Sequence, residues 1–180
     1  MSFNVAEFRS QMVGDGARPN LFQVTLTFPT IASNGTQASQ KTSFMAKGSQ
    51  LPGSTIGQIP MYYFGRELKF AGNRTFTDWS LQVINDEDFV IRNSLESWMN
   101  SINSHTTNVR NGAAINASEY SVDAIVTQYS KTGQQLKSYK FVGVFPIDVA
   151  AIDLDWGNQD TIEEYGVTFA FQYWESNTTN

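Results

Sequence analysis

Three segments of the chain alternate apolar and polar side chains with a period of two, and this pattern restricts the possible fold more than any other feature. Successive side chains of a β-strand point to opposite faces, so each such segment is expected to form a strand with one buried face. The segments are residues 20–28, 77–83 and 165–173. Their apolar positions are Phe22, Val24, Leu26 and Phe28, then Trp79, Leu81 and Val83, and finally Tyr165, Val167, Phe169, Phe171 and Tyr173.

Further strands and one helix follow from the remaining patterns. The strand candidates are residues 42–47, 61–71, 122–129 and 136–145, with a hairpin turn at 131–134. A helix is expected over about residues 86–103, where Asn85 or Asp86 can cap its first turn. Its apolar residues recur at helical spacing: Ile91, Leu95, Trp98 and Ile102. This apolar stripe predicts that the helix lies against the sheet.

Together these elements predict a mainly β fold of the α+β kind, an antiparallel β-sandwich or small barrel with one flanking α-helix. A chain of 180 residues fits a single domain, residues 1–180. We expect an N-terminal arm with a short helix at 1–19, a flexible C-terminal tail at 176–180, and long loops at 32–40 and 49–60. Such loops could reach a neighbouring subunit, although a disordered surface loop is an open alternative for the first.

The composition is poor in charge and rich in aromatic residues. Charged residues make up 16% of the chain and aromatic residues 13%, whereas a typical domain has about 25% charged residues. The cores of protein interfaces show the same depletion and enrichment, which favours a subunit that assembles. A β-rich fold with polar loops would give the same composition, and both interpretations stay open.

The distribution of charge argues against a conventional nucleic-acid-binding protein. The net charge is −5, with a sequence pI near 4.8. Residues 1–140 hold all 12 basic and 10 of the 17 acidic residues, so the last forty residues carry seven acids and no Lys or Arg. Affinity for a DNA duplex comes largely from Lys and Arg that neutralise phosphates. Nonspecific attraction to DNA is therefore disfavoured.

Cysteine usage and hydropathy exclude several other classes. The chain has no Cys, so it can form neither a disulfide framework nor a thiolate metal site. Its first residues include Asn4, Glu7 and Arg9, which interrupt the apolar run that a signal peptide needs. No segment approaches the ~20 apolar residues of a membrane span. We expect a protein that is made and kept in a cytoplasm-like medium and does not insert into a membrane.

Candidate reactive residues are few. The single histidine, His105, lies in a polar stretch after the helix, so any triad or histidine metal site would depend on it alone. Residues 48–55 match the glycine spacing of a phosphate-binding loop, but Ser54 stands where the lysine is required. Asp153 and Asp155 have the spacing of calcium ligands, yet a solvated turn is favoured. The sequence predicts no enzyme, no cofactor and no metal.

Short signature segments follow one another along almost the whole chain. The most distinctive are Ala17-Arg18-Pro19-Asn20-Leu21-Phe22-Gln23-Val24 and Ala71-Gly72-Asn73-Arg74-Thr75-Phe76-Thr77-Asp78-Trp79. With them come Leu51-Pro52, Ile59-Pro60, Asn85-Asp86-Glu87, Ala124-Ile125-Val126-Thr127-Gln128-Tyr129, Phe145-Pro146, Leu154-Asp155-Trp156 and Tyr173-Trp174-Glu175. In order and spacing these segments resemble the tail tube proteins of contractile-tailed (myovirus) bacteriophages. Residues 33–40 and 176–180 extend beyond the family pattern.

The resemblance implies a structural virion protein of the phage tail, assembled in the host cytoplasm. Its subunits would form hexameric rings stacked into a tube inside a contractile sheath, with strands from each subunit joining one continuous inner β-barrel. The partners implied are other copies of the chain, the tail sheath protein, and baseplate and tail terminator proteins. Double-stranded DNA would pass through the tube during ejection without specific binding.

Two sets of residues are candidates for roles in such a tube. The first set could form contacts between subunits, or could equally satisfy turns and pairs within one subunit: Arg18, Asn20, Arg74 and Asp78. The second set lies on the polar faces of predicted strands and could line the lumen: Gln23, Thr25, Asp78, Ser80 and Gln82. An acidic or neutral lumen wall would let DNA slide, because a basic wall would bind the phosphates. The sequence does not say which face points inward.

Alternatives remain at this point. Within the same class, the chain could be a tube-like baseplate protein that initiates the tube, or the inner tube of a related contractile secretion system. From another class, it could be a monomeric carbohydrate-binding β-module in which an exposed aromatic such as Trp156 stacks on a sugar.

Overall fold

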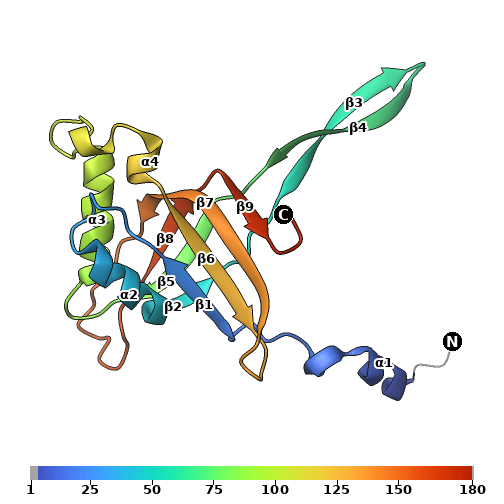
Figure 1. The fold of residues 1–180 in the computed structure, drawn as a ribbon, viewed down its shortest axis with the longest axis horizontal. Coiled ribbons are helices and arrows are strands. Elements are labelled where there is room, and N and C mark those ends of the chain that lie inside the picture. Colours follow the sequence, from blue (N-terminus) through green and yellow to red (C-terminus); the bar gives the residue numbers. More distant parts are fainter. Residues whose placement is uncertain (1–3, 180) are drawn as a thin grey trace.

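The computed structural model describes residues 4–179 and is dominated by antiparallel β-structure (Figure 1). Before the first long helix come α1 Val5–Gln11, a short 3-10 helix Val13–Asp15 and β1 Phe22–Leu26. The middle of the chain forms α2 Gly35–Met45, β2 Ala46–Ser49, β3 Thr55–Tyr63, β4 Arg66–Thr75, β5 Trp79–Ile84 and α3 Val90–Ile102. A second 3-10 helix Gly112–Ala114 and α4 Ala117–Tyr120 precede β6 Val122–Tyr129, β7 Gln135–Val149, β8 Glu164–Ala170 and β9 Tyr173–Ser176.

Seven strands form one sheet that folds over on itself. The order is β1-β6-β7-β8-β5-β2, with β9 also paired to β7. The 15-residue strand β7 belongs to two halves of this sheet, because residues 135–144 pair with β6 and β9, whereas residues 145–149 pair with β8. Gly143, at the change of partner, has a φ of +70°, which a residue with a side chain rarely adopts. We call the two halves the β6 half (β1, β6, β9 and residues 135–144) and the β5 half (β2, β5, β8 and residues 145–149).

The inner faces of the two halves pack on each other and form the core. Trp79 of β5 stacks on Phe141 of β7 with ring centroids 4.7 Å apart, and it lies 5.3 Å from Phe169 of β8. Most of the alternating positions predicted in these strands are buried: Val24, Leu26, Trp79, Leu81, Val83, Tyr165, Val167 and Phe169. Phe22, Phe28 and Phe171 are half-buried, and Tyr173 is exposed. The predicted β-rich antiparallel fold class is therefore confirmed.

Helix α3 covers one end of this sandwich. Its predicted apolar residues Ile91, Leu95 and Trp98 are buried. Trp98 packs between Phe28 and Phe169, and its Nε1–H donates to the Tyr120 carbonyl at 2.7 Å. Because the indole N–H, the only donor of this side chain, has an acceptor, the large ring can be fully buried at the junction of helix and sheet.

The helix begins at Val90 rather than near residue 86, and side-chain contacts explain the difference. Asp88 Oδ1 accepts the Val90 N–H at 3.1 Å, and Lys41 of α2 forms ion pairs with both Asp86 and Asp88. The Lys41 ammonium and the Val90 amide hold the pKa of Asp88 below its usual value. Phe89 then has a φ of +51°. These contacts hold residues 86–88 in a turn, so the helix cannot begin there.

The expected loop at 32–40 and strand at 42–47 are both wrong for the most part, because residues 35–45 form α2 and only residues 46–47 of the predicted strand lie in β2. The helix is polar and buries only Ala38 and Thr42, so it gives almost no periodic signal. It is held by tertiary contacts: Ser39 Oγ accepts the Phe28 N–H at 3.0 Å, and α2 packs on β1 and α3. Thr42 Oγ1 donates to the Ala38 carbonyl at 2.7 Å, so its buried hydroxyl is satisfied. The fold therefore has two flanking helices, α2 and α3, although only one was predicted.

The expected loop at 49–60 and single strand at 61–71 are also wrong in part, because residues 55–75 form the β3–β4 hairpin. Phe64 and Gly65 form its two-residue turn, with φ of +47° and +79°, as a type I′ turn requires. A phenylalanine at such a position is uncommon, which hides the turn in the sequence. Pro60 is tolerated because each strand of a lone hairpin has a free edge where no amide donor is needed.

The predicted strand at 165–173 divides where the chain crosses from one half of the sheet to the other. Phe171 and Gln172 separate β8 from β9. In the predicted flexible tail, Ser176 ends β9, its N–H donates to Thr179 Oγ1 at 2.7 Å, and Lys137 Nζ donates to Thr178 Oγ1 at 2.9 Å. Residue 180 of the tail and residues 1–3 of the predicted N-terminal arm lie outside the described residues.

One buried hydroxyl of the core gives a first testable prediction. Tyr165 is 2% exposed, and its hydroxyl has no hydrogen-bond partner among residues 4–179. Burial raises the pKa of this group. We expect Tyr165→Phe to stabilise the fold by about 1 kcal/mol, because it removes a polar group that lost its hydration without a replacement. Chemical denaturation measures the change. A lower denaturation midpoint for Tyr165→Phe would contradict the conclusion that its hydroxyl is buried without a partner. The control is Tyr129→Phe, which loses a 3.0 Å hydrogen bond to Gln23 and should not be stabilised.

Candidate assembly surfaces

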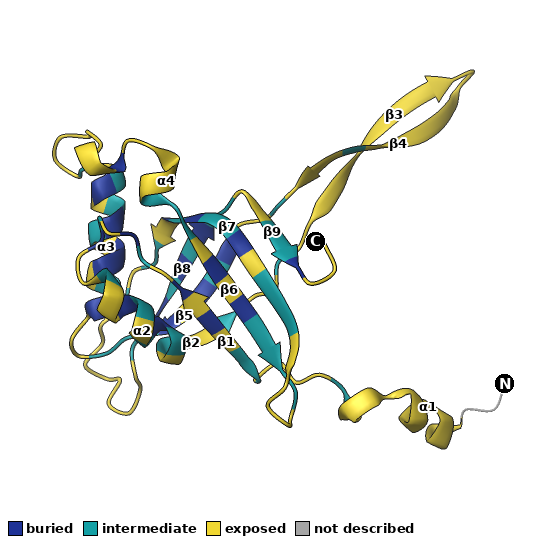
Figure 2. Cartoon of the chain, in the orientation of Figure 1, coloured by how far each residue is buried: buried dark blue, intermediate teal, exposed yellow. Residues whose placement is uncertain are grey.

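The β3–β4 hairpin projects from the sandwich, and its two strands pack mainly against each other (Figures 1 and 2). Every residue of β3 is exposed, and β4 has only one position of intermediate exposure. The hairpin is held at its base, where Trp174 Nε1 donates to the Gly53 carbonyl at 3.1 Å and Phe76 packs against Trp174. The hairpin is thus an appendage of the fold and contributes nothing to its core.

The two faces of the hairpin differ in chemistry. Residues directly opposite each other in the ladder share a face. One face therefore carries the pairs Ile59–Phe70, Met61–Leu68 and Tyr63–Arg66, and the other carries Gln58–Ala71, Pro60–Lys69 and Tyr62–Glu67. Phe64 at the tip is 92% exposed. We call the side with Ile59, Met61, Tyr63, Leu68 and Phe70 the apolar face. A continuous exposed apolar stripe of this kind marks a protein–protein contact.

The N-terminal arm is a second projecting segment. Its helix α1 buries none of its residues, and Val5 and Phe8 are 78% and 66% exposed. Asn4 caps the helix by accepting the Ala6 N–H at 3.0 Å. A seven-residue helix is too short to be stable alone. The exposed apolar residues of the arm are therefore available to a surface outside its own chain.

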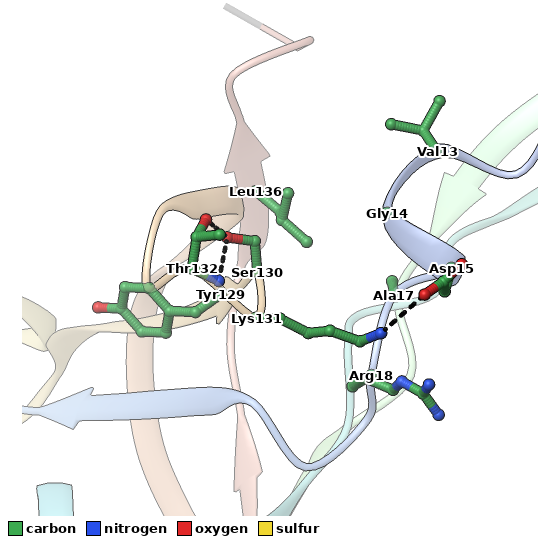
Figure 3. A pocket seen from close by; sticks show the side chains of 11 residues that line it. Val13, Gly14, Asp15, Ala17, Arg18, Tyr129, Ser130, Lys131, Thr132 and Leu136 are labelled. Atoms are coloured by element: carbon green, nitrogen blue, oxygen red, sulfur yellow. Dashed lines mark hydrogen bonds and ion pairs between the residues drawn. The ribbon is translucent and has the colours of Figure 1, made fainter.

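A cavity of about 350 Å³ lies where the arm passes the β6–β7 turn (Figure 3). Val13 and Leu136 contribute apolar surface to its wall, and Lys131 Nζ reaches across to Asp15 Oδ2 at 3.3 Å. Arg18 lies on the arm side. Its polar groups are the solvated charges of Asp15, Arg18 and Lys131 and the hydroxyls of Tyr129, Ser130 and Thr132, of which Ser130 and Thr132 bond to each other.

The candidate contact residues lie in two separate stretches of the chain. Arg18 and Asn20 precede β1, whereas Arg74 lies in β4 and Asp78 just before β5. All four are exposed. Within residues 4–179 no ion pair joins them to each other or to another residue. A role between subunits stays a prediction for each of them.

The structure separates the candidate lumen residues into two groups on opposite sides of the molecule. Gln23 and Thr25 flank the buried Val24, so they point outward from the β6 half. Ser80 and Gln82 flank the buried Leu81 and point outward from the β5 half, with Asp78 just before that strand. Because the two inner faces pack on each other, the two outer faces point in opposite directions. One flat lumen wall cannot contain both groups.

The two outer faces also differ in charge. In the β6 half, Lys140 Nζ lies 2.8 Å from Asp123 Oδ2, and Glu175 is opposite Lys140 on β9. The hydrogen bond that Lys140 donates to the Asp123 carboxylate raises the pKa of Lys140. On the β5 half, the central residues of β5 and β8 are uncharged: Ser80, Gln82, Gly166 and Thr168. The charges of this second face lie beside these residues, where Asp148 of β7 is opposite Thr168 and Lys47 of β2 pairs with Glu164.

The structure gives no chemical role to the residues considered earlier for catalysis or metal binding. His105 is exposed, and its backbone N–H donates to Asn100 Oδ1 at 3.2 Å. Asp155 Oδ1 accepts the Gly157 N–H at 2.9 Å, which is a turn contact. No group of three possible metal ligands occurs among residues 4–179, and no helix in that range is long and apolar enough to span a membrane. The features that stand out are the hairpin and the arm.

A compact sandwich with two projecting apolar segments defines a structural subunit that assembles with other proteins. Comparison with known proteins is more specific. Residues 17–177 match the phage tail tube protein family. The chain is 32% identical over 163 residues to the tail tube protein gp19 of Enterobacteria phage T4, covering 90% of this chain and 93% of gp19. It is 28% identical to the tail tube protein of Serratia phage KSP90, covering 89% and 90% of the two chains. The chain belongs to the phage tail tube protein family of contractile-tailed phages.

Solved structures share the fold. A chain from the tube-terminating cap of the anti-feeding prophage superposes with a TM-score of 0.64 at 14% identity, covering 92% of this chain and 93% of that one. A chain from the sheath–tube complex of an extracellular contractile injection system superposes with a TM-score of 0.59 at 13% identity, covering 98% and 99%. As a tail tube protein, the chain is a structural component of the virion tail and not an enzyme, which favours this role over a carbohydrate-binding module.

Proposed function

We propose that copies of this chain form hexameric rings that stack into the inner tube of a contractile tail, and that double-stranded DNA passes through this tube during ejection. The observation that carries the proposal is the exposed apolar face of the β3–β4 hairpin, which the chain cannot cover itself. Assembly from copies of one chain covers such a face in every subunit. The relatives in phages T4 and T6 are tail tube proteins of nearly the same length.

The folded-over sheet is suited to forming a shared barrel. β1 and β2 lie at the two ends of the strand order, so strands of neighbouring subunits can extend the sheet. Roughly 16 to 18 strands already enclose an aqueous channel. Six subunits that each contribute several strands would enclose a wide lumen, and ring closure would remove the free sheet edges.

We assign the lumen wall to the outer face of the β5 half. Its centre carries the uncharged residues Ser80, Gln82 and Thr168. Asp148 lies opposite Thr168, and Lys47 at the edge is paired with Glu164, so none of these residues offers an unpaired cation to the DNA phosphates. The opposite face, with Lys140, Asp123 and Glu175, then points away from the DNA. Of the candidate lumen residues, Ser80, Gln82 and Asp78 keep that role, and Gln23 and Thr25 become the control.

A phage that carries Ser80→Lys with Gln82→Lys is expected to eject its DNA several-fold more slowly while it assembles normal tails. Lysines on the wall would bind phosphates through counterion release, and the delay should shrink as salt rises. Time-resolved fluorescence of released DNA measures the rate, and electron microscopy checks the tails. The matched control is Gln23→Lys with Thr25→Lys. Slow ejection in the control and normal ejection in the first variant would place the other face in the lumen.

Assembly itself is tested by electron microscopy of the purified chain at rising concentration, with and without a preformed baseplate. Stacked rings support the tube subunit. A single ring that does not stack would indicate a tube initiator of the baseplate, and monomers even beside a competent baseplate would contradict the proposal. The tail sheath protein, the baseplate and the tail terminator are the further partners we propose, with assembly in the host cytoplasm.

A further inference from the structure

We propose that the apolar face of the β3–β4 hairpin packs against the loop of residues 150–163 in a neighbouring copy of the chain. This contact rests on the proposed tube and names the surfaces that would join its subunits. We call residues 150–163, which connect β7 to β8, the acidic loop.

The acidic loop has exposed apolar side chains of its own. Trp156 is 100% exposed, Leu154 80% and Ile162 71%. The Asp155 carboxylate accepts the Gly157 N–H at 2.9 Å, and the Asp155 carbonyl accepts the Asn158 N–H at 3.1 Å. This turn holds Trp156 at the surface, where nothing in the described chain covers it. A fully exposed tryptophan on a fixed turn is a typical anchor of a protein contact.

The hairpin and the acidic loop are complementary in charge. The loop holds Asp153, Asp155, Asp160 and Glu163 and no basic residue, which gives a charge of −4. Residues 55–75 of the hairpin hold Arg66, Lys69 and Arg74 against Glu67, which gives +2. None of these hairpin cations has an ion-pair partner among residues 4–179. Arg66 lies beside Tyr63 on the apolar face, so it can meet a carboxylate while the apolar residues meet Leu154 and Trp156.

The positions of the two surfaces require that the contact joins different copies. The hairpin projects from one end of the sandwich, and the acidic loop lies at the opposite end, near α2 and α3 (Figure 1). Two different surfaces at opposite ends of one subunit form a heterologous contact, which can repeat along a stack without limit. The inference therefore gives the tube a polarity, with each hairpin reaching towards the next acidic loop.

Charge reversal tests the contact. The hairpin variant Arg66→Glu, and the loop variant Asp153→Lys with Asp160→Lys, are each expected to lower tube yield by about tenfold, because like charges then face each other. Combining the hairpin variant with the loop variant should restore the yield to near that of the unsubstituted chain. The specificity control combines the hairpin variant with Glu87→Lys, an exposed acid outside the loop, and should restore nothing.

Tubes are counted by electron microscopy of baseplate-seeded reactions, and circular dichroism confirms that each variant is folded. Suppose that the unsubstituted chain forms tubes. If the variants of one surface then also form tubes, or if the combined variant does not recover the yield, the contact is wrong and the tube function stands. If the unsubstituted chain forms no tubes beside a competent baseplate, both proposals fail. A photo-crosslinker at position 64 supplies an independent readout: crosslinks to residues 150–163 support the contact, and crosslinks to the cavity beside Leu136 overturn it.

Discussion

A chain whose residues 56–74 are replaced by Asn-Gly is expected to remain folded and to lose tube formation completely. Thr55 and Thr75 face each other at the base of the hairpin, so a two-residue turn can join them. The removed segment packs mainly on itself, and its loss should leave the melting temperature nearly unchanged. Tube growth should fail because the apolar face is the surface that covers a neighbour. Thermal melting and electron microscopy of seeded reactions measure the two effects.

The two faces of the hairpin supply the control for this deletion. Substituting Ser for Ile59, Met61 and Phe70 changes the apolar face and should reproduce the loss of tubes. Substituting Ser for Gln58 and Tyr62 changes the opposite face and should have a much smaller effect. Full-length tubes from the truncated chain would show that the hairpin has no part in assembly. A large drop in melting temperature would instead show that it stabilises the subunit.

Replacing Trp98 with alanine is expected to destabilise the subunit by about 3–5 kcal/mol, the usual range for deleting a buried aromatic side chain. Trp98 is 0% exposed and joins α3 to both Phe28 and Phe169. In a domain of this size each kcal/mol lowers the melting temperature by about 2–4 °C, so a drop of about 10 °C is expected. Thermal unfolding of the unassembled subunit is the measurement.

A second substitution at the same position separates packing from hydrogen bonding. Trp98→Phe keeps an aromatic ring but leaves the Tyr120 carbonyl without its 2.7 Å donor, which should cost about 1–3 kcal/mol. The alanine variant should be the less stable of the two. If both variants have the same melting temperature as the unsubstituted chain, then α3 does not complete the core. A hairpin variant measured alongside should be stable but unable to assemble, because the core and the assembly surface share no residue.

Periodicity alone predicted the elements that bury one regular face. The alternation around Val24, Leu81 and Val167 gave three strands of the sandwich, because burial of every second residue depends on local geometry. The helical spacing of Leu95 and Trp98 gave α3 for the same reason. The ordered signature segments around Arg18 and Arg74 indicated the tail tube family, which the comparisons confirm.

Helix α2 and the β3–β4 hairpin depend on tertiary contacts, and the local sequence patterns did not predict them. Helix α2 is polar and is held by its packing on β1 and α3, so its sequence has no periodic apolar stripe from which it could be predicted. The hairpin turn at Phe64 requires a backbone conformation that phenylalanine seldom adopts, and the cross-strand register then places Ile59 beside Phe70 on one exposed face.

The candidate lumen residues show the same division most clearly. The sequence correctly placed Gln23 and Gln82 on the polar sides of their strands, since that depends only on alternation. Whether two strands turn their polar sides in the same direction depends on where β7 passes from one half of the sheet to the other. That change of partner is a long-range property of the packed chain, and it separates residues that the sequence had grouped together.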